Sequence, residues 1–268
     1  MRIKQTFDNL KQKQQTAFVA YLCAGDPSYE TSLQTMINMP KLGVDIIEVG
    51  MPFSDPSGDG PIIEMASKRA IASGMTMQKT LNLVADFRKQ NQTTPIVLMT
   101  YFNPLLKFGI DKAFTAIKQA GIDGILIVDL PPEEEQEIMQ FLPTAQLDLI
   151  RLVAPTTSSQ RAELILQNAS GFVYLISLMG ITGTKDADPA RNIDTLQQLK
   201  KITNLPIVVG FGIKTAKQAQ AFSKIGADGI VIGSAIVEKM AENNIQEINN
   251  FITEIANHIN YATKISES

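Results

Sequence analysis

A closed (β/α)8 barrel, the TIM-barrel fold, is the α/β architecture that three features of this sequence predict. Short aliphatic runs typical of buried parallel strands alternate with helical patterns along the chain. Eight such units occur, and strict alternation implies parallel strands joined by right-handed crossovers. The length of 268 residues suits a barrel of about 250 residues. No linker composition divides the chain, so we expect a single domain over residues 1–268.

The predicted elements begin with a short amphipathic helix within residues 1–15, where Ile3, Phe7 and Leu10 have helical spacing. The eight predicted strands are Ala17–Cys23, Val44–Met51, Ile96–Tyr101, Gly124–Leu130, Leu149–Ala154, Phe172–Ser177, Pro206–Phe211 and Gly229–Gly233. The predicted helices after them are Tyr29–Met39, Ile62–Ala72 with Met77–Lys89, Lys112–Ala120, Glu133–Leu142, Ser159–Asn168, Ile193–Ile202, Ala216–Ile225 and Ile245–Ile259. The polar tail, residues 262–268, is expected to be frayed.

A glycine, an aliphatic residue and an aspartate recur ahead of three predicted strands, at residues 43–45, 121–123 and 226–228. The shared pattern indicates divergent repeats. Glycine at this position ends the preceding helix in a left-handed conformation, and the aspartate helps turn the chain into the strand.

Composition excludes several classes of function. A net charge of −3 and a pI near 5.3 argue against nucleic acid or an anionic membrane as a partner. No segment has the length and apolarity of a membrane span, and Met1–Gln15 is too polar for a signal peptide. A single cysteine, Cys23, rules out an internal disulfide and fits a reducing cytoplasm. His258 is the only imidazole, so we expect no metal site and no cofactor.

Two carboxylates organise the second unit. Glu48 interrupts the aliphatic run of its strand, and a buried carboxylate needs a local reason. Asp59 ends the loop that follows, which is dense in Gly, Pro, Ser and Asp. Together they form a candidate acid/base pair. The alternative is that Glu48 pairs with a nearby cation and Asp59 caps the helix after Pro61, and spacing alone does not choose between the two interpretations.

Further candidates follow from the position of active sites in these barrels, at the C-terminal ends of the strands. Tyrosines there either pack at the edge of the core or, for Tyr21 and Tyr174, wall an apolar substrate slot. Asp129 either caps a turn or takes part in catalysis. The residues at these ends are Tyr21, Glu48, Tyr101 with Asn103, Asp129, Tyr174, Phe211 and Ser234.

Glycine-rich turns follow the last three strands, at residues 180–184, 210–213 and 233–236. Glycine lets backbone N–H groups approach a phosphate, and a helix starting near Ser234 would direct its positive end at it. The sequence therefore predicts a phosphate site around Gly183, Gly212, Gly233 and Ser234. The alternative is that these glycines only form tight turns.

One long motif with fixed internal spacing is Glu48-Val49-Gly50-x-Pro52-Phe53-Ser54-Asp55-Pro56-x-x-Asp59-Gly60-Pro61. It resembles the signature of the tryptophan synthase alpha chain family. Further matches are Ala24-Gly25-Asp26-Pro27, Thr100-Tyr101-x-Asn103-Pro104, Tyr174-Leu175-Ile176-Ser177-x-x-Gly180-Ile181-Thr182-Gly183, Gly210-Phe211-Gly212-Ile213 and Gly233-Ser234-Ala235-Ile236-Val237. The match extends from about Phe18 to Val237. Ser57, Glu64 and Leu178 differ from the usual pattern.

The resemblance implies retro-aldol cleavage of indole-3-glycerol phosphate to indole and glyceraldehyde 3-phosphate. It implies that Glu48 is the general acid/base, that Asp59 binds the ring N–H, and that Thr182 helps to hold Asp59. It further implies a pyridoxal-phosphate-dependent beta chain as partner in an α2β2 heterotetramer, to which indole is passed. Asp55 is a candidate contact with that chain, and Pro52 and Phe53 stiffen its approach.

The residues present fit that chemistry. No predicted strand contains the lysine that a Schiff-base aldolase needs, and the aliphatic neighbours of Glu48 favour its protonated form. The alternatives are a stand-alone indole-3-glycerol phosphate lyase, another phosphate-binding barrel such as indole-glycerol-phosphate synthase or a sugar-phosphate isomerase, and a catalytically idle subunit that activates a partner. Retention of both carboxylates argues against the idle subunit.

Overall fold

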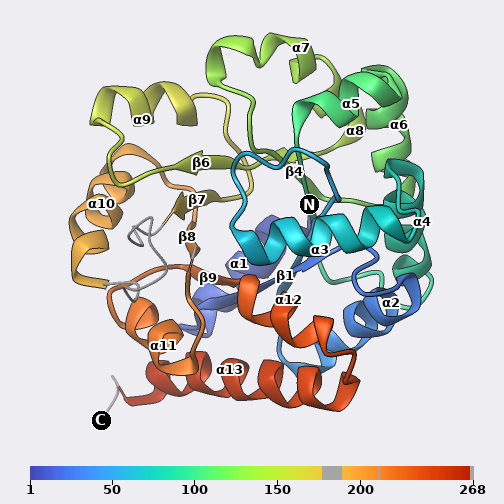
Figure 1. The fold of residues 1–268 in the computed structure, drawn as a ribbon. Helices are drawn as coiled ribbons and strands as arrows, with labels where there is room; N and C mark the ends of the chain where they lie inside the picture. The colour runs from blue at the N-terminus through green and yellow to red at the C-terminus, as the bar shows by residue number, and fades with distance from the viewer. Residues whose placement is uncertain (177–188, 211, 266–268) are drawn as a thin grey trace.

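The computed structural model describes residues 1–176, 189–210 and 212–265. The strands of this part of the chain form one parallel sheet in the order β5-β4-β3-β2-β1-β9-β8-β7-β6, and helices surround it (Figure 1). The strands are β1 Ala17–Cys23, β2 Ile46–Gly50, β3 Ile96–Thr100, β4 Gly124–Ile127, β5 Asp148–Leu149, β6 Arg151–Val153, β7 Val173–Ile176, β8 Ile207–Gly210 and β9 Gly229–Ile232. The predicted TIM barrel is confirmed.

The fifth predicted strand is divided in two, and this division closes the barrel. β5 pairs with β4 and β6 pairs with β7, so the chain changes its neighbour between the two short strands. Ile150 lies at the change and still donates its N–H to the carbonyl of Ile125 (2.9 Å). One predicted strand thus becomes two, because it serves two neighbours in succession.

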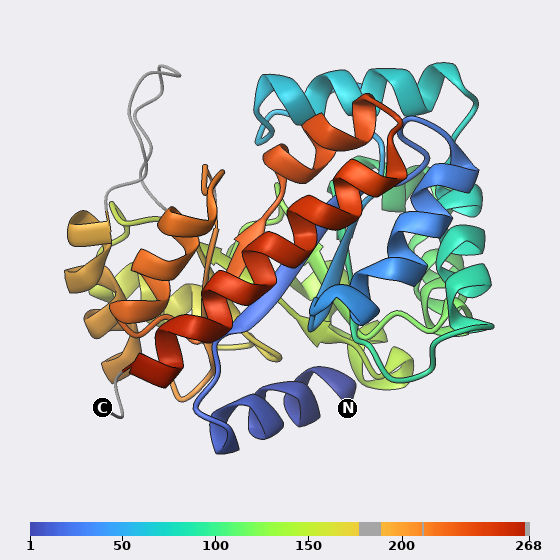
Figure 2. The same cartoon turned by 90° about the horizontal axis from the view of Figure 1, so that it is seen from below.

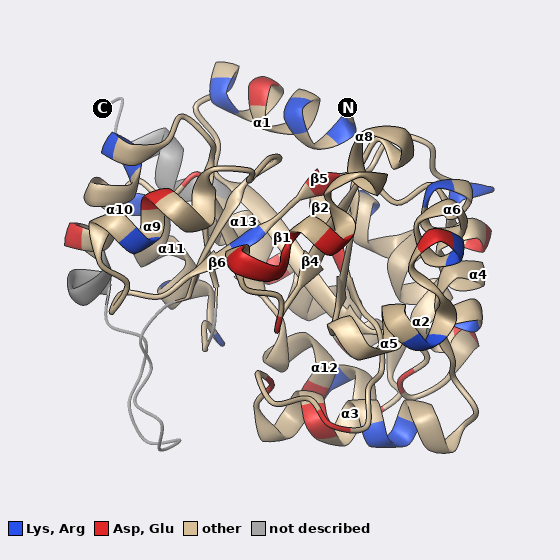
Figure 3. Cartoon of the chain, turned by 90° about the horizontal axis from the view of Figure 1, so that it is seen from above, with Lys and Arg blue, Asp and Glu red and all other residues tan. Residues whose placement is uncertain are grey.

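The helices lie mainly between the strands, as predicted. They are α1 Arg2–Gln12, α2 Tyr29–Asn38, α3 Pro61–Ala72, α4 Met77–Arg88, α5 Phe102–Phe108, α6 Ile110–Ala120, α7 Gln136–Met139, α8 Phe141–Ala145, α9 Ser159–Leu166, α10 Pro189–Ile202, α11 Ala216–Lys224, α12 Ser234–Ala241 and α13 Ile245–Ile265, with 3₁₀ turns η1 Met39–Leu42 and η2 Pro132–Glu134. Among the described residues, no helix is both long and apolar enough to cross a membrane. Charged residues lie mostly on these helices and loops, while the strands are largely uncharged (Figure 3).

Three helix predictions need correction. The single helix expected over Glu133–Leu142 is broken into η2, α7 and α8, because Glu135 turns inward to a buried ion pair with Arg151. The helix α5 was not predicted, because it is short and contains Pro104 near its start. The last helix continues to Ile265, so the backbone of residues 262–265, which was expected to be frayed, is helical. No glycine or proline interrupts that segment.

The N-terminal helix α1 closes the bottom of the barrel. Ile3, Phe7 and Leu10 are buried beneath the strands, and the ring of Phe7 lies 5.9 Å from that of Phe172, next to the start of β7. In Figure 2, α1 lies at one end of the barrel and α3 with α12 lies at the other. The C-terminal strand ends, where the candidate site lies, therefore face away from α1.

The three repeated aspartates each join two neighbouring strands at their N-terminal ends by hydrogen bonds. The glycine two residues before each one has a left-handed φ, as predicted (+98° at Gly43, +82° at Gly121, +90° at Gly226). Each aspartate donates its backbone N–H to a carbonyl of a neighbouring strand and accepts that residue's N–H with its carboxylate. The pairs are Asp45 with Phe18, Asp123 with Ile96 and Asp228 with Ile207. These carboxylates are therefore structural.

Candidate active site

Glu48 lies inside the barrel, and one oxygen of its carboxyl group has no hydrogen-bond partner among the described residues. It is the third residue of β2 and stands in register with Tyr21 of β1 and Val97 of β3. Its side chain is 2 % exposed, and Oε1 has no hydrogen-bond partner among the described residues. No described lysine or arginine forms an ion pair with it. The structure therefore does not support the alternative in which Glu48 serves as a structural ion-pair partner.

Burial makes Glu48 an acid at neutral pH. Desolvation, followed by the nearby charge of Asp59, raises the pKa of this carboxyl from its ordinary value to about 8. A carboxyl group with this pKa carries a proton at about pH 7 and is able to donate it. That protonation state is the one a general acid requires.

Asp59 approaches the same space from the loop between β2 and α3. It does not cap α3, because the N-cap residue is Gly60 and no side-chain cap hydrogen bond is present. Its carboxylate is half-buried and accepts a hydrogen bond from the hydroxyl of Tyr101. Burial raises the pKa of Asp59 to about 6, and the bond from Tyr101 opposes that rise. The charge of Asp59 acts on Glu48, and the two pKa values differ, so near pH 7 Glu48 carries a proton while Asp59 is ionised.

Two tyrosines cover the neighbouring strand ends in the same way. A Cβ added to Gly50 would lie 2.1 Å from the hydroxyl oxygen of Tyr21, and a Cβ added to Gly210 would lie 2.4 Å from that of Tyr174. Each tyrosine is buried and crosses to the next strand, where only glycine leaves room. Burial, together with the charges of Asp59 and Glu48, raises the pKa of both hydroxyls. Both hydroxyls therefore remain neutral beside the carboxyl pair.

Asp129 binds the start of a neighbouring helix. Its exposed carboxylate accepts the backbone N–H of Phe102 (2.7 Å), at the start of α5. Asn103 lies within the same helix. The observed contact of Asp129 is therefore with the start of α5, while its turn-capping and catalytic roles both stay predictions. No group of three or more His, Cys, Asp or Glu side chains that could hold a metal occurs among the described residues.

Of the three glycine-rich turns predicted to bind phosphate, the structure describes most of the turn at residues 210–213 and the turn at residues 233–236. Gly212 has a φ of +74°, a conformation that glycine adopts readily and other residues rarely do. The helix α12 begins at Ser234 with Gly233 as its N-cap residue, so its first N–H groups lie at the end of β9. Of the other predicted site residues, Thr182, Gly183 and Phe211 lie outside the described residues.

The candidate partner contacts lie on the loop that carries Asp59. Pro52 is buried, the ring of Phe53 packs on that of Tyr101 with centroids 5.1 Å apart, and Asp55 is exposed. Sequence reasoning did not identify the two most exposed apolar side chains on the helices that follow β2 and β3, Met65 (51 % exposed) and Leu106 (49 %).

The residues that differ from the usual motif pattern have simple local roles where they are described. Glu64 pairs with Lys68 on the surface of α3 (2.6 Å), and Ser57 is exposed within the loop. Neither residue contacts Glu48 through an observed hydrogen bond or ion pair. Leu178 lies outside the described residues.

A partly buried ion pair not predicted from the sequence joins the motif after β1 to α3. Asp26, which is 1 % exposed, accepts hydrogen bonds from Nε and Nη2 of Arg69 (2.7 and 2.9 Å). The pair ties the loop after β1 to α3, the helix that follows Asp59. Asp26 stood in a matched motif, but its partner 43 residues away carries no local signal.

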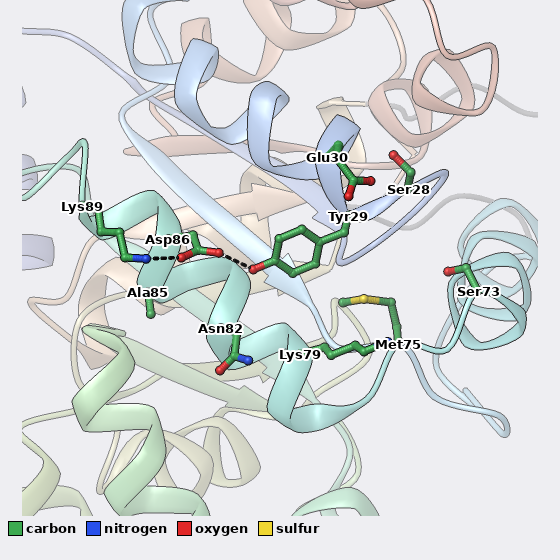
Figure 4. Close-up of a pocket in the computed structure, with 10 residues that line it drawn as sticks. All are labelled: Ser28, Tyr29, Glu30, Ser73, Met75, Lys79, Asn82, Ala85, Asp86 and Lys89. Carbon is green, nitrogen blue, oxygen red and sulfur yellow. Dashed lines mark hydrogen bonds and ion pairs between the residues drawn. The ribbon is translucent and has the colours of Figure 1, made fainter.

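A surface pocket of about 710 Å³ between α2 and α4 is separate from this site (Figure 4). Within it the hydroxyl of Tyr29 donates to Asp86 (2.6 Å), and Asp86 also accepts from Lys89 (2.7 Å). Neither Glu48 nor Asp59 lines the pocket. It is therefore not the candidate active site, although its Tyr–Asp bond offers a useful control.

Comparisons with known proteins find similarity over nearly the whole chain. The family model for the tryptophan synthase alpha chain matches residues 7–265. Tryptophan synthase subunit alpha from Legionella pneumophila str. Paris shares 33% identity, with a TM-score of 0.89 over 97% of this chain and 98% of that one. The aminoacrylate-bound form of tryptophan synthase from M. tuberculosis includes a chain of 30% identity, with a TM-score of 0.87 over 96% and 99% of the two chains. A protein from Aquifex aeolicus VF5 is 35% identical, with a TM-score of 0.88 over 96% and 98%.

Proposed function

The chain belongs to the tryptophan synthase alpha chain family, and we propose that Glu48 and Asp59 carry out that family's reaction in it. Members of this family are lyases that cleave indole-3-glycerol phosphate. The products are indole and glyceraldehyde 3-phosphate. The observation that supports the assignment best is the buried carboxyl group of Glu48, which forms no ion pair with a described residue and whose raised pKa reflects its burial and the charge of Asp59.

A retro-aldol cleavage needs an electron sink. None of the described strands contains a lysine that could form a Schiff base with the substrate. The indole ring supplies its own sink once C3 is protonated, because the positive charge then delocalises to the ring nitrogen. The protein must therefore deliver one proton to C3 and stabilise charge at the nitrogen.

Glu48 and Asp59 divide these tasks. Protonated Glu48 donates its proton to C3 of the ring, while the carboxylate of Asp59 accepts the ring N–H and stabilises the developing positive charge. The carboxylate left on Glu48 then takes the proton of the side-chain hydroxyl next to the ring. The bond between C3 and the side chain breaks, its electrons restore the aromatic ring, and the hydroxyl carbon becomes the aldehyde. Glu48 ends protonated, as it began.

The phosphate of the substrate is proposed to bind the backbone around Gly212 and the start of α12 at Ser234. Substituting Gly212 by alanine should raise KM about tenfold or more, because alanine is strained at a φ of +74° and the turn must move. Neutralising the exposed Lys214 as Lys214→Ala should raise KM by no more than about threefold, since surface charge pairs are weak. Steady-state kinetics of both variants provide the comparison. Equal losses would place the phosphate on the lysine instead.

We propose that this chain docks a beta chain in an α2β2 heterotetramer through the loop that carries Asp59. Asp55 is exposed on that loop, and Met65 and Leu106 present apolar surface on the adjoining helices. Indole is small, neutral and apolar, so direct transfer to a partner limits its loss from an open site. A docked chain in this position would also bias the loop towards closure over the substrate.

The experiment for both proposals measures indole release from indole-3-glycerol phosphate by the isolated chain, and then titrates in the cognate beta chain. We expect slow release alone, faster release in the complex, and tighter association when a non-cleavable substrate analogue is bound, because coupled binding is reciprocal. Release without any complex would favour the stand-alone lyase. No release under either condition, with stimulation of the beta chain, would favour the idle activating subunit.

We also propose that the chain is one domain acting in a reducing cytoplasm. A single apolar core includes side chains from Ile3 of α1 to Ile259 of α13. Cys23 is a buried free thiol. Both observations fit an intracellular barrel enzyme.

A further inference from the structure

Tyr101 contacts the loop that carries Asp59 at three points. Its hydroxyl accepts the backbone N–H of Gly58 (2.9 Å) and donates to the carboxylate of Asp59. Its ring packs on the ring of Phe53, with the two planes tilted by 33°. Tyr101 itself is 3 % exposed and directly follows β3, so the barrel wall fixes its position.

Gly58 makes the close approach of the loop to Tyr101 possible. A Cβ at this position would lie 2.7 Å from Cγ1 of Val128 and 3.3 Å from the hydroxyl oxygen of Tyr101. The first distance is shorter than carbon atoms tolerate, so any side chain at this position would push the loop away from the barrel wall. Gly58 therefore allows the loop to pack closely against Tyr101, although Gly58 itself has no side chain that could take part in catalysis.

We propose that Tyr101 is a positioning residue for Asp59, which holds the loop so that the carboxylate stays ionised and faces the ring nitrogen of the substrate. The proposal rests on the role of Asp59 proposed above. Tyr101 does not exchange a proton with the substrate. It fixes the place of the loop through the hydrogen bond from Gly58 and the ring contact with Phe53, and its hydroxyl favours the ionised carboxylate of Asp59.

Several groups from different strands face Asp59, and the hydroxyl of Tyr101 has a distinct effect among them. Burial raises the pKa of Asp59, and the hydrogen bond from Tyr101 lowers it. The titratable groups that interact with the charge of Asp59 are Tyr21 and Cys23 of β1, Glu48 of β2, Tyr101 after β3 and Tyr174 of β7. Loss of the Tyr101 hydroxyl should therefore make Asp59 harder to ionise, with the ring contact to Phe53 retained.

The test is the pH profile of kcat/KM for Tyr101→Phe in the complete chain. The acid limb, which reports the ionisation of Asp59 in the free enzyme, should move to higher pH by about half a unit to one unit. At pH values below this limb, the loss of kcat/KM relative to wild type should be about 3- to 10-fold larger than the loss at the pH optimum. In the variant, kcat should fall by a larger factor than KM rises. The basic limb, which reports Glu48, should move by less than the acid limb.

The matched control is Tyr29→Phe. It removes a tyrosine hydroxyl that also donates to an aspartate, Asp86, but on the outer surface between α2 and α4. We expect this variant to keep both limbs of the wild-type profile. An acid limb that stays in place in Tyr101→Phe, or that moves equally in Tyr29→Phe, would overturn the proposal. A uniform loss of activity at every pH would show a purely structural role and would also overturn it.

Gly58→Ala provides a second variant that leaves Tyr101 intact. Its added methyl group should displace the loop, and we expect the same upward move of the acid limb with a native circular dichroism spectrum. This variant keeps the idea testable if Tyr101→Phe is unstable. Failure here is separable from failure of the proposed function. If the wild-type chain releases indole and Glu48→Gln does not, but both loop variants titrate like the wild type, only the role of Tyr101 is wrong.

Discussion

Replacing Glu48 by glutamine is expected to lower indole release by about 10²- to 10⁴-fold, the usual contribution of one positioned acid. The amide is nearly isosteric with the protonated carboxyl group but has no acidic proton to give to C3. Since the side chain is buried and makes no ion pair with a described residue, its loss breaks no salt bridge. Single-turnover release of indole is the measurement. The control is Glu163→Gln, the same change at an exposed site on α9, which should leave the rate within about twofold.

The same substitution should stabilise the fold, which separates lost chemistry from misfolding. The pKa of Glu48 is raised in the folded chain to about 8. Below the unfolded pKa the carboxyl group is protonated in both states and costs no stability, but as the pH rises towards about 8 the unfolded chain ionises more readily and the wild-type fold loses stability. Glutamine does not titrate. The gain of Glu48→Gln over wild type should therefore grow from about pH 4.5 and level off above about pH 8. Near pH 7 it should approach roughly 3 kcal/mol, less the cost of an unpaired buried amide.

Urea unfolding at several pH values measures this gain. A stability difference that does not change with pH would show that Glu48 titrates normally and would remove the physical basis for its role as an acid. Residual cleavage within about tenfold of wild type, in a variant with native circular dichroism, would exclude Glu48 as the proton donor.

Asp59→Asn is expected to lower kcat/KM by about 10²- to 10³-fold, as for the loss of one preorganised group that faces developing charge. The amide oxygen still accepts the ring N–H but carries no full negative charge to stabilise the protonated ring. Asp111→Asn, at an exposed site on α6, is the matched control and should remain close to wild type.

The pH profile sharpens this prediction. Wild-type kcat/KM should be bell-shaped, rising as Asp59 ionises near its pKa of about 6 and falling as Glu48 loses its proton near about 8. In Asp59→Asn the acid limb should disappear. The basic limb should shift to lower pH, because the charge of Asp59 contributes to the raised pKa of Glu48. An unchanged basic limb would show that the two carboxyl groups do not interact.

Local patterns were enough to predict the barrel and the candidate pair. Buried parallel strands appear in the sequence as runs of aliphatic residues, and helices appear as apolar residues with a 3.6-residue period. All eight strand–helix units could therefore be located. Glu48 stood out because a carboxylate in an aliphatic strand is costly, and Asp59 because it ended a loop of turn residues. The left-handed glycines before Asp45, Asp123 and Asp228 also followed from local chemistry.

Contacts between distant residues decided the rest. Whether Glu48 had a cationic partner, and whether Asp59 capped α3, depended on which side chains the folded barrel brings near them. Three further features also depend on distant residues. Tyr101 contacts a loop 43 residues away, Tyr21 packs against Gly50, and the fifth strand pairs with two neighbours in succession. Periodicity reports which face of an element is buried, but it carries no information on what lies opposite that face. Only packing in three dimensions places a hydroxyl against a carboxylate and thereby sets its pKa.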